Sequence, residues 1–338
     1  MDPNESQNQS LKGVVGIQNI GNTCYCNSTL QLIRACPHWS AFCLTQNFSE
    51  YKDSKYKRVL VAYQDILRSL WSSYKPAYVR PLGFISEIRN SVKDTVYEMF
   101  GILIPNDSHE FLVYLLDSFH EAIKTESPYI ENTSNTMSAM SENGWNKFLS
   151  KNNSEIVNMF FGMIRKTIHC TTCKNNTYQW EVFNSLKIPC DGQTFKEWIQ
   201  NEMKESEIEG YNCENCSKTS GCKLAKIYSH IWRLPYNLFI TLHRFNSNGT
   251  KNMIKCPYEG ENINFSEYFA EESDDPSREW MYEVRGVSDH HGSHMGGHYT
   301  TQFKHPISEE WWMLDDATAT KQHPHFSESN YIFLFIKI

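Results

Sequence analysis

Long apolar runs are missing from this 338-residue sequence. The longest is "YIFLFIKI" at residues 331–338, and it falls well short of the roughly 18 residues that a membrane-spanning helix needs. The first 25 residues also lack the basic and then apolar order of a secretory signal peptide. We therefore expect neither membrane insertion nor export, and the final apolar run predicts a buried strand.

A basic surface is missing too. Lys and Arg number 32 against 39 for Asp and Glu, which gives a net charge of -7, and basic residues do not cluster between aromatic ones. A nucleic-acid partner is therefore not expected. The hydrophobic content of 40% is ample for burial, and the length exceeds that of one compact core, so we expect two or three lobes.

Cysteine, in contrast, is plentiful, with 11 residues. Without a leader, so many cysteines indicate free thiols and metal ligands in a reducing compartment rather than a disulfide framework. We expect a monomer in the cytoplasm or the nucleus.

Helical patterns dominate the first half of the chain. Apolar spacing predicts helices from Cys24 to about Ala35 and over roughly residues 57–74. The clearest helix is "NDSHEFLVYLLDSFHEAIK", with Asp107 as N-cap and Glu110 in the position of a capping box. Residues 125–143 are rich in Ser, Thr and Asn and predict a flexible connection.

From about residue 156 onward, segments typical of β-strands take over. They include "IVNMFFGMIRKTI", "TYQWEVFNSLKI", "NLFITLHRF", "HYTTQF", "WWMLDD" and "YIFLFIKI". Helices followed by strands predict an α+β fold. The acidic stretch "EESDDPSRE" is interpreted as a solvated loop.

Two Cys-x-x-Cys pairs, Cys170 with Cys173 and Cys213 with Cys216, have the spacing of zinc knuckles. Together they would supply four thiolates to one tetrahedral Zn²⁺ ion with a structural role. The alternatives are four buried thiols without metal, a redox pair, for which the expected βαβ pattern is absent, and replacement of one ligand by Cys222.

The segment "DHHGSHMGGHYTTQF" holds four histidines and at first suggests a metal-binding tract. His298 differs from the others because two glycines precede it and a β-type segment follows. This context places His298 at the start of a strand beside a mobile loop. "WWMLDD" ends in Asp315 and Asp316, and a carboxylate there would orient the imidazole.

These residues carry a resemblance to a known family. "GIQNIGNTCYCNSTLQL" resembles the Cys box of the ubiquitin-specific proteases, and "VRGVSDHHGSHMGGHYTTQF" with "WWMLDDATAT" resembles their His box. "NDSHEFLVYLLDSF" is similar to the segment between the two boxes, and the stretches around the Cys-x-x-Cys pairs are similar to those that flank the family's zinc fingers. The resemblance extends from about residue 13 to 338, after an extension of residues 1–12 expected to be flexible.

The resemblance implies a papain-like cysteine protease fold that cleaves after the C-terminal diglycine of ubiquitin, with ubiquitin and ubiquitinated proteins as partners. It implies a helical thumb at about 13–155, zinc-ribbon fingers at about 160–245, and a β-rich palm at about 156–190 and 230–338. An inactive ubiquitin-binding scaffold and a protease for another ubiquitin-like modifier are the alternatives.

Carried over residue by residue, the resemblance makes Cys24 the nucleophile, His298 the general base and Asp315 the residue that orients it. Asp316 is a second candidate for the orienting role or for a contact with water. Asn19 matches the side chain that stabilises the oxyanion. A helix N-terminus and a nearby imidazole both favour the thiolate, so we expect a lowered pKa for Cys24.

The same resemblance implies that Asp107, Glu110 and Tyr299 line the passage for the ubiquitin tail. The competing explanation for the two acids is local, namely that they cap their own helix. Residues 288–297 are expected to form a loop that blocks the passage or opens around the tail. Cys26, two residues after the nucleophile, is interpreted as a packing residue.

Overall fold

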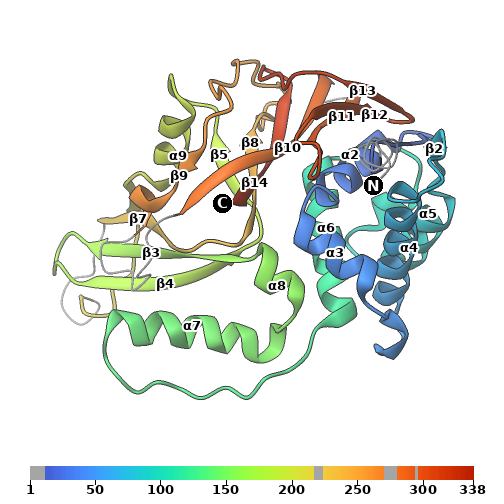
Figure 1. Cartoon of the computed structure of the whole chain (residues 1–338). Coiled ribbons are helices and arrows are strands. Elements are labelled where there is room, and N and C mark those ends of the chain that lie inside the picture. Colours follow the sequence, from blue (N-terminus) through green and yellow to red (C-terminus); the bar gives the residue numbers. More distant parts are fainter. Residues whose placement is uncertain (1–11, 217–223, 270–279, 294–295) are drawn as a thin grey trace.

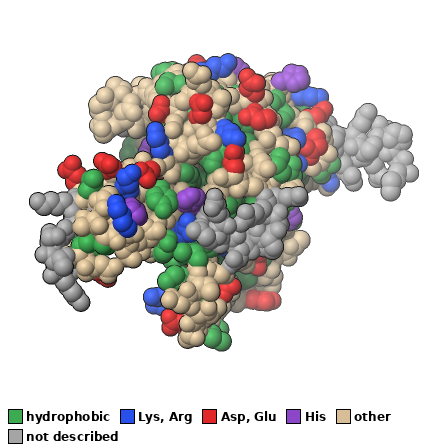
Figure 2. All heavy atoms as spheres, turned by 90° about the vertical axis from the view of Figure 1, so that its left-hand side faces the viewer, with side chains coloured by type: hydrophobic (Ala, Val, Ile, Leu, Met, Phe, Trp, Pro, Cys, Tyr) green, Lys and Arg blue, Asp and Glu red, His purple; other side chains and the backbone are tan. Residues whose placement is uncertain are grey.

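The computed structural model describes residues 12–216, 224–269, 280–293 and 296–338. The expected N-terminal extension up to residue 11, the acidic stretch "EESDDPSRE", Cys222 and His294 lie outside these ranges. Across the described ranges, no helix combines the length and the apolar character needed to cross a membrane. Acidic and basic side chains are interspersed on the face seen in Figure 2.

One lobe, the thumb, is built from helices (Figure 1). Its elements are α2 (Cys24–Ile33), α3 (Pro37–Thr45), η1 (Phe48–Glu50), α4 (Lys55–Leu70), α5 (Leu82–Val92), η2 (Glu98–Gly101) and α6 (Ser108–Ile123), with the short parallel pair β1 (Gly16–Ile17) and β2 (Tyr78–Val79). Helices α4 and α6 are amphipathic, and their apolar faces, with Leu67 and Leu115, pack into one shared core. The three helices expected in this half of the chain are confirmed.

The second lobe, the palm, is one large sheet with the strand order β13-β12-β11-β10-β14-β8-β5, in which β9 also pairs with β10. Its strands are β5 (Leu186–Pro189), β8 (Asn237–His243), β9 (Ile263–Asn264), β10 (Met281–Ser293), β11 (Gly296–Lys304), β12 (Trp311–Asp315), β13 (Thr318–Lys321) and β14 (Asn330–Lys337). The described pairings are antiparallel except for β5 with β8.

The run "YIFLFIKI" is apolar without alternation because β14 is covered on both faces. Ile332, Leu334 and Ile336 belong to the core shared with the thumb helices. Phe333 and Phe335 point the other way, into a second core closed by α9 (Phe195–Met203). The palm therefore joins the thumb through one face and carries its own helix on the other.

The third part, the fingers, is a four-stranded sheet with the order β4-β3-β7-β6. Its strands are β3 (Gly162–Cys170), β4 (Asn176–Phe183), β6 (Ser206–Glu209) and β7 (Leu224–Arg233), and the remaining elements of the chain are α7 (Met137–Asn152), α8 (Glu155–Phe160) and η3 (Ser266–Tyr268). Figure 1 shows α7 beneath β3 and β4, away from the thumb helices. The structure therefore has the expected mixture of helical thumb, sheet-rich palm and extended fingers.

The prediction of a flexible connection over residues 125–143 is wrong for its second half, where α7 begins at Met137. Thr136 caps this helix by accepting a hydrogen bond from the backbone N–H of Ala139. Trp145 then packs with Trp180 and other apolar residues of the fingers. The polar composition concealed the helix because its apolar side chains are few and are buried only by tertiary contact.

Two further boundaries differ from the sequence prediction. Residues 156–160, expected as part of a strand, belong to α8, whose first turn is capped by Ser154. The loop expected at 288–297 is largely a hairpin, because β10 extends to Ser293 and β11 starts at Gly296. At 156–160 a short apolar run fits helix and strand patterns equally well, whereas the polar segment at 288–297 becomes strand only through its pairing with the neighbouring chain segment.

The contact that places the thumb on the palm is polar and buried. Ser28 of α2 is 3% exposed, and its Oγ lies 2.7 Å from Ser288 Oγ and 2.8 Å from Thr301 Oγ1. The hydroxyl of Thr301 in turn donates to the carbonyl oxygen of Ser28 at 3.0 Å. These bonds set the position of α2 along β10 and β11, because a shifted helix would leave buried hydroxyls without partners.

We expect the substitution Ser28→Ala to lower the free energy of unfolding by about 1–3 kcal/mol, because it removes the centre of this buried hydroxyl cluster. Urea unfolding monitored by fluorescence measures the change. The matched control is Thr45→Ala, which removes an exposed hydroxyl that donates to Ala41 at 2.8 Å and should cost less than about 0.5 kcal/mol. Equal costs for the two variants would contradict this role of Ser28.

Candidate active site

The thiol of Cys24 sits at the first residue of α2 and is 7% exposed. Asn19 helps to hold the loop before it, since its Oδ1 accepts hydrogen bonds from the backbone N–H groups of Gly21 and Thr23 at 3.0 and 3.1 Å. Gly21 and Asn22 both have positive φ angles, 115° and 53°, which a glycine and an asparagine tolerate best. The sequence "NIGNTC" is therefore a turn that leads directly into the helix.

His298 and Asp315 form a pair, as the sequence predicted. The Nε2 atom of His298 lies 2.6 Å from Asp315 Oδ1, whereas Asp316 Oδ2 is 4.0 Å away. His298 is in β11 and Asp315 ends the neighbouring strand β12. Because Nε2 is taken by the carboxylate, Nδ1 is the ring nitrogen left to act on another group.

Asp316 has a different set of partners. Its Oδ2 accepts from Asn19 Nδ2 at 2.9 Å and its Oδ1 accepts from Asn27 Nδ2 at 2.7 Å. Its backbone oxygen accepts from the N–H of Ile17 at 2.7 Å. Gly16 is required next to this turn, since a Cβ there would lie 2.2 Å from the carbonyl carbon of Ala317. Asp316 therefore ties the loop before Cys24, and α2 itself, to the end of β12.

The expected lowering of the Cys24 pKa is not found. Burial raises the pKa of the Cys24 thiol above its usual 9.0, a hydrogen bond from the backbone of Tyr299 partly opposes this, and the negative charge of Asp316 raises it further. The loss of hydration around a buried sulfur outweighs the helix N-terminus. The hydrogen bond from the Tyr299 backbone also shows that the residue after His298 lies directly against the Cys24 sulfur.

A cleft of about 460 Å³ opens at Cys24 and lies between thumb and palm. Asp107, Glu110 and Tyr299, the three residues expected to contact the substrate, all line it. Gly297 lines it as well, and a Cβ there would come within 2.4 Å of the His290 Nε2 atom. The two glycines before His298 suggested a close approach of the backbone, and Gly297 indeed packs closely against His290.

For Asp107 the local explanation is confirmed, and contact with a substrate stays a prediction. Its Oδ1 accepts from the backbone N–H groups of His109 and Glu110 at 2.8 and 2.9 Å, so it caps α6. Its Oδ2 accepts from the hydroxyl of Tyr331 at 2.7 Å on the cleft side. The carboxylate thus stabilises the helix and also gives the cleft wall a negative charge.

Sequence reasoning missed several residues of the site. Asn27, which holds Asp316, is three residues after Cys24 and so lies on the same side of α2, which was a usable signal. His290 and Tyr331 line the cleft, and their rings contact Tyr299, with centroids 4.7 and 6.3 Å away. Nothing in the local sequence marks these two, because they reach the cleft only through strand pairing.

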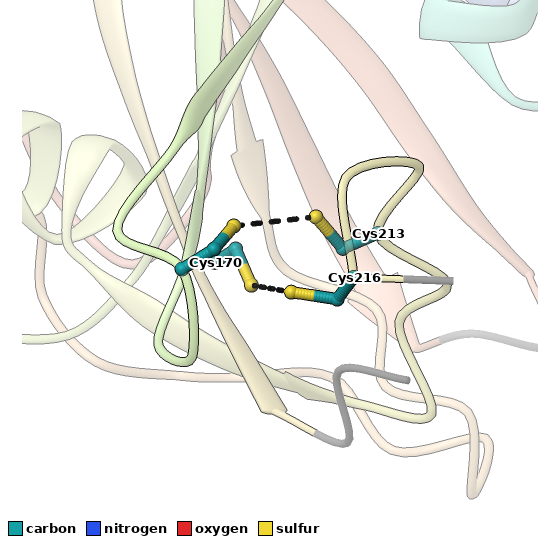
Figure 3. A group of neighbouring side chains, drawn as sticks. Cys170, Cys213 and Cys216 are labelled. Atoms are coloured by element: carbon teal, nitrogen blue, oxygen red, sulfur yellow. Dashed lines mark hydrogen bonds between the residues drawn. The ribbon is translucent and has the colours of Figure 1, made fainter. Parts of the chain in front are cut away.

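The four cysteines of the two Cys-x-x-Cys pairs meet at the tip of the fingers (Figure 3). Cys170 Sγ lies 3.7 Å from Cys216 Sγ, and Cys173 Sγ lies 3.6 Å from Cys213 Sγ. All four sulfurs are within 4.8 Å of one another. A tetrahedron with zinc–sulfur bonds of about 2.3 Å has edges of about 3.8 Å, so these residues fit one zinc ion with no position left open.

A cysteine at a helix N-terminus, whose sulfur meets the backbone of the residue after a histidine that pairs with an aspartate on the next strand, agrees with the papain-like cysteine hydrolases. The family model "Ubiquitin carboxyl-terminal hydrolase" matches residues 15–335. The chain therefore belongs to the ubiquitin carboxyl-terminal hydrolase family, and the resemblance to the ubiquitin-specific proteases is confirmed.

Curated relatives agree with this assignment. The chain is 25% identical over 344 residues to ubiquitin carboxyl-terminal hydrolase Usp2 of Drosophila melanogaster, an alignment that covers 98% of this chain and 35% of that protein. It is 24% identical over 332 residues to ubiquitin carboxyl-terminal hydrolase 2 of Homo sapiens, which covers 92% of this chain and 53% of that protein. The chain thus spans between a third and a little over half of the length of these relatives.

Solved structures share the fold. The SAGA Ubp8/Sgf11/Sus1/Sgf73 module bound to ubiquitin aldehyde contains a chain that matches with a TM-score of 0.73 and 21% identity, covering 98% of this chain and 70% of that chain. A structure of the Ubp8-containing module bound to monoubiquitin matches with a TM-score of 0.74, 21% identity and the same coverage. The predicted α+β fold with thumb, palm and fingers is confirmed.

We expect the rate at which iodoacetamide modifies Cys24 in the free protein to keep rising with pH through pH 9. The reason is that a raised thiol pKa leaves little thiolate at neutral pH. Mass spectrometry of the peptide that contains Cys24 follows the reaction, with glutathione as the reference thiol. A plateau already reached between pH 5 and 8 would mean that the thiolate is stabilised after all.

Proposed function

We propose that this chain is a deubiquitinating thiol protease that hydrolyses the isopeptide or peptide bond after the C-terminal glycine of ubiquitin. The main support is that Cys24 opens into the cleft between thumb and palm while the backbone of Tyr299, next to His298, contacts its sulfur. Family membership and the ubiquitin ligands of the Ubp8-containing structures agree with this activity.

In this mechanism His298 removes the proton from Cys24. Asp315 accepts a hydrogen bond from Nε2, so the ring presents Nδ1 as the basic atom. Because burial raises the pKa of Cys24, the thiol holds its proton until the base takes it as the sulfur attacks the carbonyl carbon. The same proton then goes to the departing amine, and water hydrolyses the thioester with His298 again as the base.

The negative oxygen of the tetrahedral intermediate needs donors near the start of α2. The Nδ2 group of Asn19 has two hydrogens, and Asp316 takes one at 2.9 Å. The second remains for the oxyanion, together with the backbone N–H groups of the first helical turn. Such a donor is worth on the order of 3 kcal/mol in comparable sites. Asp316 then acts as the residue that orients Asn19.

The cleft offers two carboxylates to an extended peptide, and Lys187 also lines it. Asp107, Glu110 and Tyr299 all line the cleft. Arginines of the ubiquitin tail would form charge-assisted hydrogen bonds with the two carboxylates. We also propose that the four-cysteine cluster of the fingers binds one structural Zn²⁺ ion. The ion holds the β3–β4 and β6–β7 turns together and takes no part in cleavage.

We expect Cys24→Ala to lower the hydrolysis of ubiquitin with a C-terminal fluorogenic amide by at least about 1,000-fold while binding of ubiquitin persists. Fluorescence release measures turnover, and calorimetry measures binding. Cys26→Ala is the control, since this thiol is 0% exposed and packs away from the cleft. Hydrolysis that survives in Cys24→Ala, or a wild type that does not react, would overturn the proposal.

We expect purified protein to contain one zinc ion per chain and Cys213→Ser to lose it, because a site with three thiolates binds the ion less tightly. Elemental mass spectrometry gives the metal content. Cys190→Ala, which removes a buried thiol from the palm core, should keep one zinc ion. Wild-type protein prepared without chelators and free of zinc would rule the metal site out.

A further inference from the structure

Three consecutive aliphatic side chains, Ile102, Leu103 and Ile104, are exposed by 57, 37 and 43%. We call them the aliphatic ridge. Their backbone is held in place, because Asn22 Nδ2 donates to the Leu103 carbonyl at 3.1 Å and Asn106 Nδ2 donates to the Ile104 carbonyl at 3.0 Å. An ordered row of exposed aliphatic side chains is a feature of interaction sites rather than of ordinary solvated loops.

The ridge lies beside the nucleophile but outside the cleft. The cleft lining includes Cys24, Pro105 and Asn106, but neither the ridge nor Gly21 and Asn22. Leu103 instead approaches the turn before Cys24, since its Cδ1 atom lies 3.3 Å from the position that a Cβ on Gly21 would take. The ridge therefore borders the Gly21–Asn22 turn before the nucleophile and lies outside the set of residues that line the cleft.

This placement matters for the two halves of a substrate. Under the proposed function, the ubiquitin tail fills the cleft and its last carbonyl carbon reaches Cys24. The polypeptide beyond the scissile bond must then leave past Cys24 without entering the part of the cleft that the tail fills, and the ridge borders the turn just before Cys24. Residues 99–106, "MFGILIPN", contain no charged residue, so this surface fits an apolar partner and offers little to a charged one.

We propose that the aliphatic ridge binds apolar side chains of the acceptor polypeptide next to the lysine that carries ubiquitin. The inference rests on the proposed function and adds a specificity for the leaving group. Ile102 and Ile104 make this contact, whereas Leu103 also packs beside the turn that precedes the nucleophile.

The test uses ubiquitin joined by an isopeptide bond to the central lysine of two synthetic peptides. One peptide carries Leu and Val on both sides of the lysine, and the other carries Ser and Gly. We expect the wild type to cleave the apolar conjugate with a kcat/KM higher by roughly 3- to 10-fold, the gain that burial of one or two aliphatic contacts supplies. The double variant Ile102→Ser/Ile104→Ser should bring this ratio close to one.

The matched control is Ile130→Ser/Ile307→Ser, which removes two aliphatic side chains that are 82 and 63% exposed elsewhere on the molecule and should keep the wild-type ratio. Hydrolysis of ubiquitin with a C-terminal fluorogenic amide reports separately on the catalytic site. A wild type that cleaves this amide but treats both conjugates alike would overturn the inference alone, as would a preference that persists in the ridge variant. A wild type that cleaves none of the three would overturn the proposed function as well.

Discussion

The site depends on how α2 docks on the β10–β11 hairpin. Ser28 joins the two through the hydroxyls of Ser288 and Thr301, and these bonds are buried. Cys24 is four residues earlier, one turn of the helix away, so the same docking brings its sulfur against the backbone of Tyr299. Because thumb and palm meet through this contact, it fixes the cleft between them and the position of Cys24 relative to the strand that carries His298.

Two adjacent carboxylates have different tasks because the chain turns between them. Asp315 is still in β12 and reaches His298, and its side chain is 54% exposed. Asp316 has a φ angle of 45° and a side chain that is 16% exposed, and it bonds to Asn19 and Asn27. In the proposed mechanism Asp315 orients the general base His298 and Asp316 positions the oxyanion donor Asn19. The turn between the two aspartates therefore fixes the base and the oxyanion donor relative to each other.

The active-site side of the molecule and the fingers are stabilised in different ways. The palm sheet is buried on both faces, by the thumb on one and by α9 on the other. At the tip of the fingers, the described residues form a small cluster around Cys170, Cys213 and Cys216. A site that fits one zinc ion therefore occurs where apolar burial is least able to hold two turns together. None of the four cysteines lines the cleft at Cys24, which agrees with a structural role.

Much of this protein follows from local sequence. "NTC" before an apolar period predicts a helix that starts at Cys24, the Cys-x-x-Cys spacing predicts the four-cysteine cluster, and "GGH" with "WWMLDD" indicates the His298–Asp315 pair. The tertiary structure alone decided that residues 137–143 are helical, that burial raises the pKa of Cys24, and that His290 and Tyr331 line the cleft. The reason is physical. Caps, turns and knuckles depend on residues a few positions apart, whereas burial and strand pairing depend on partners that local sequence does not reveal.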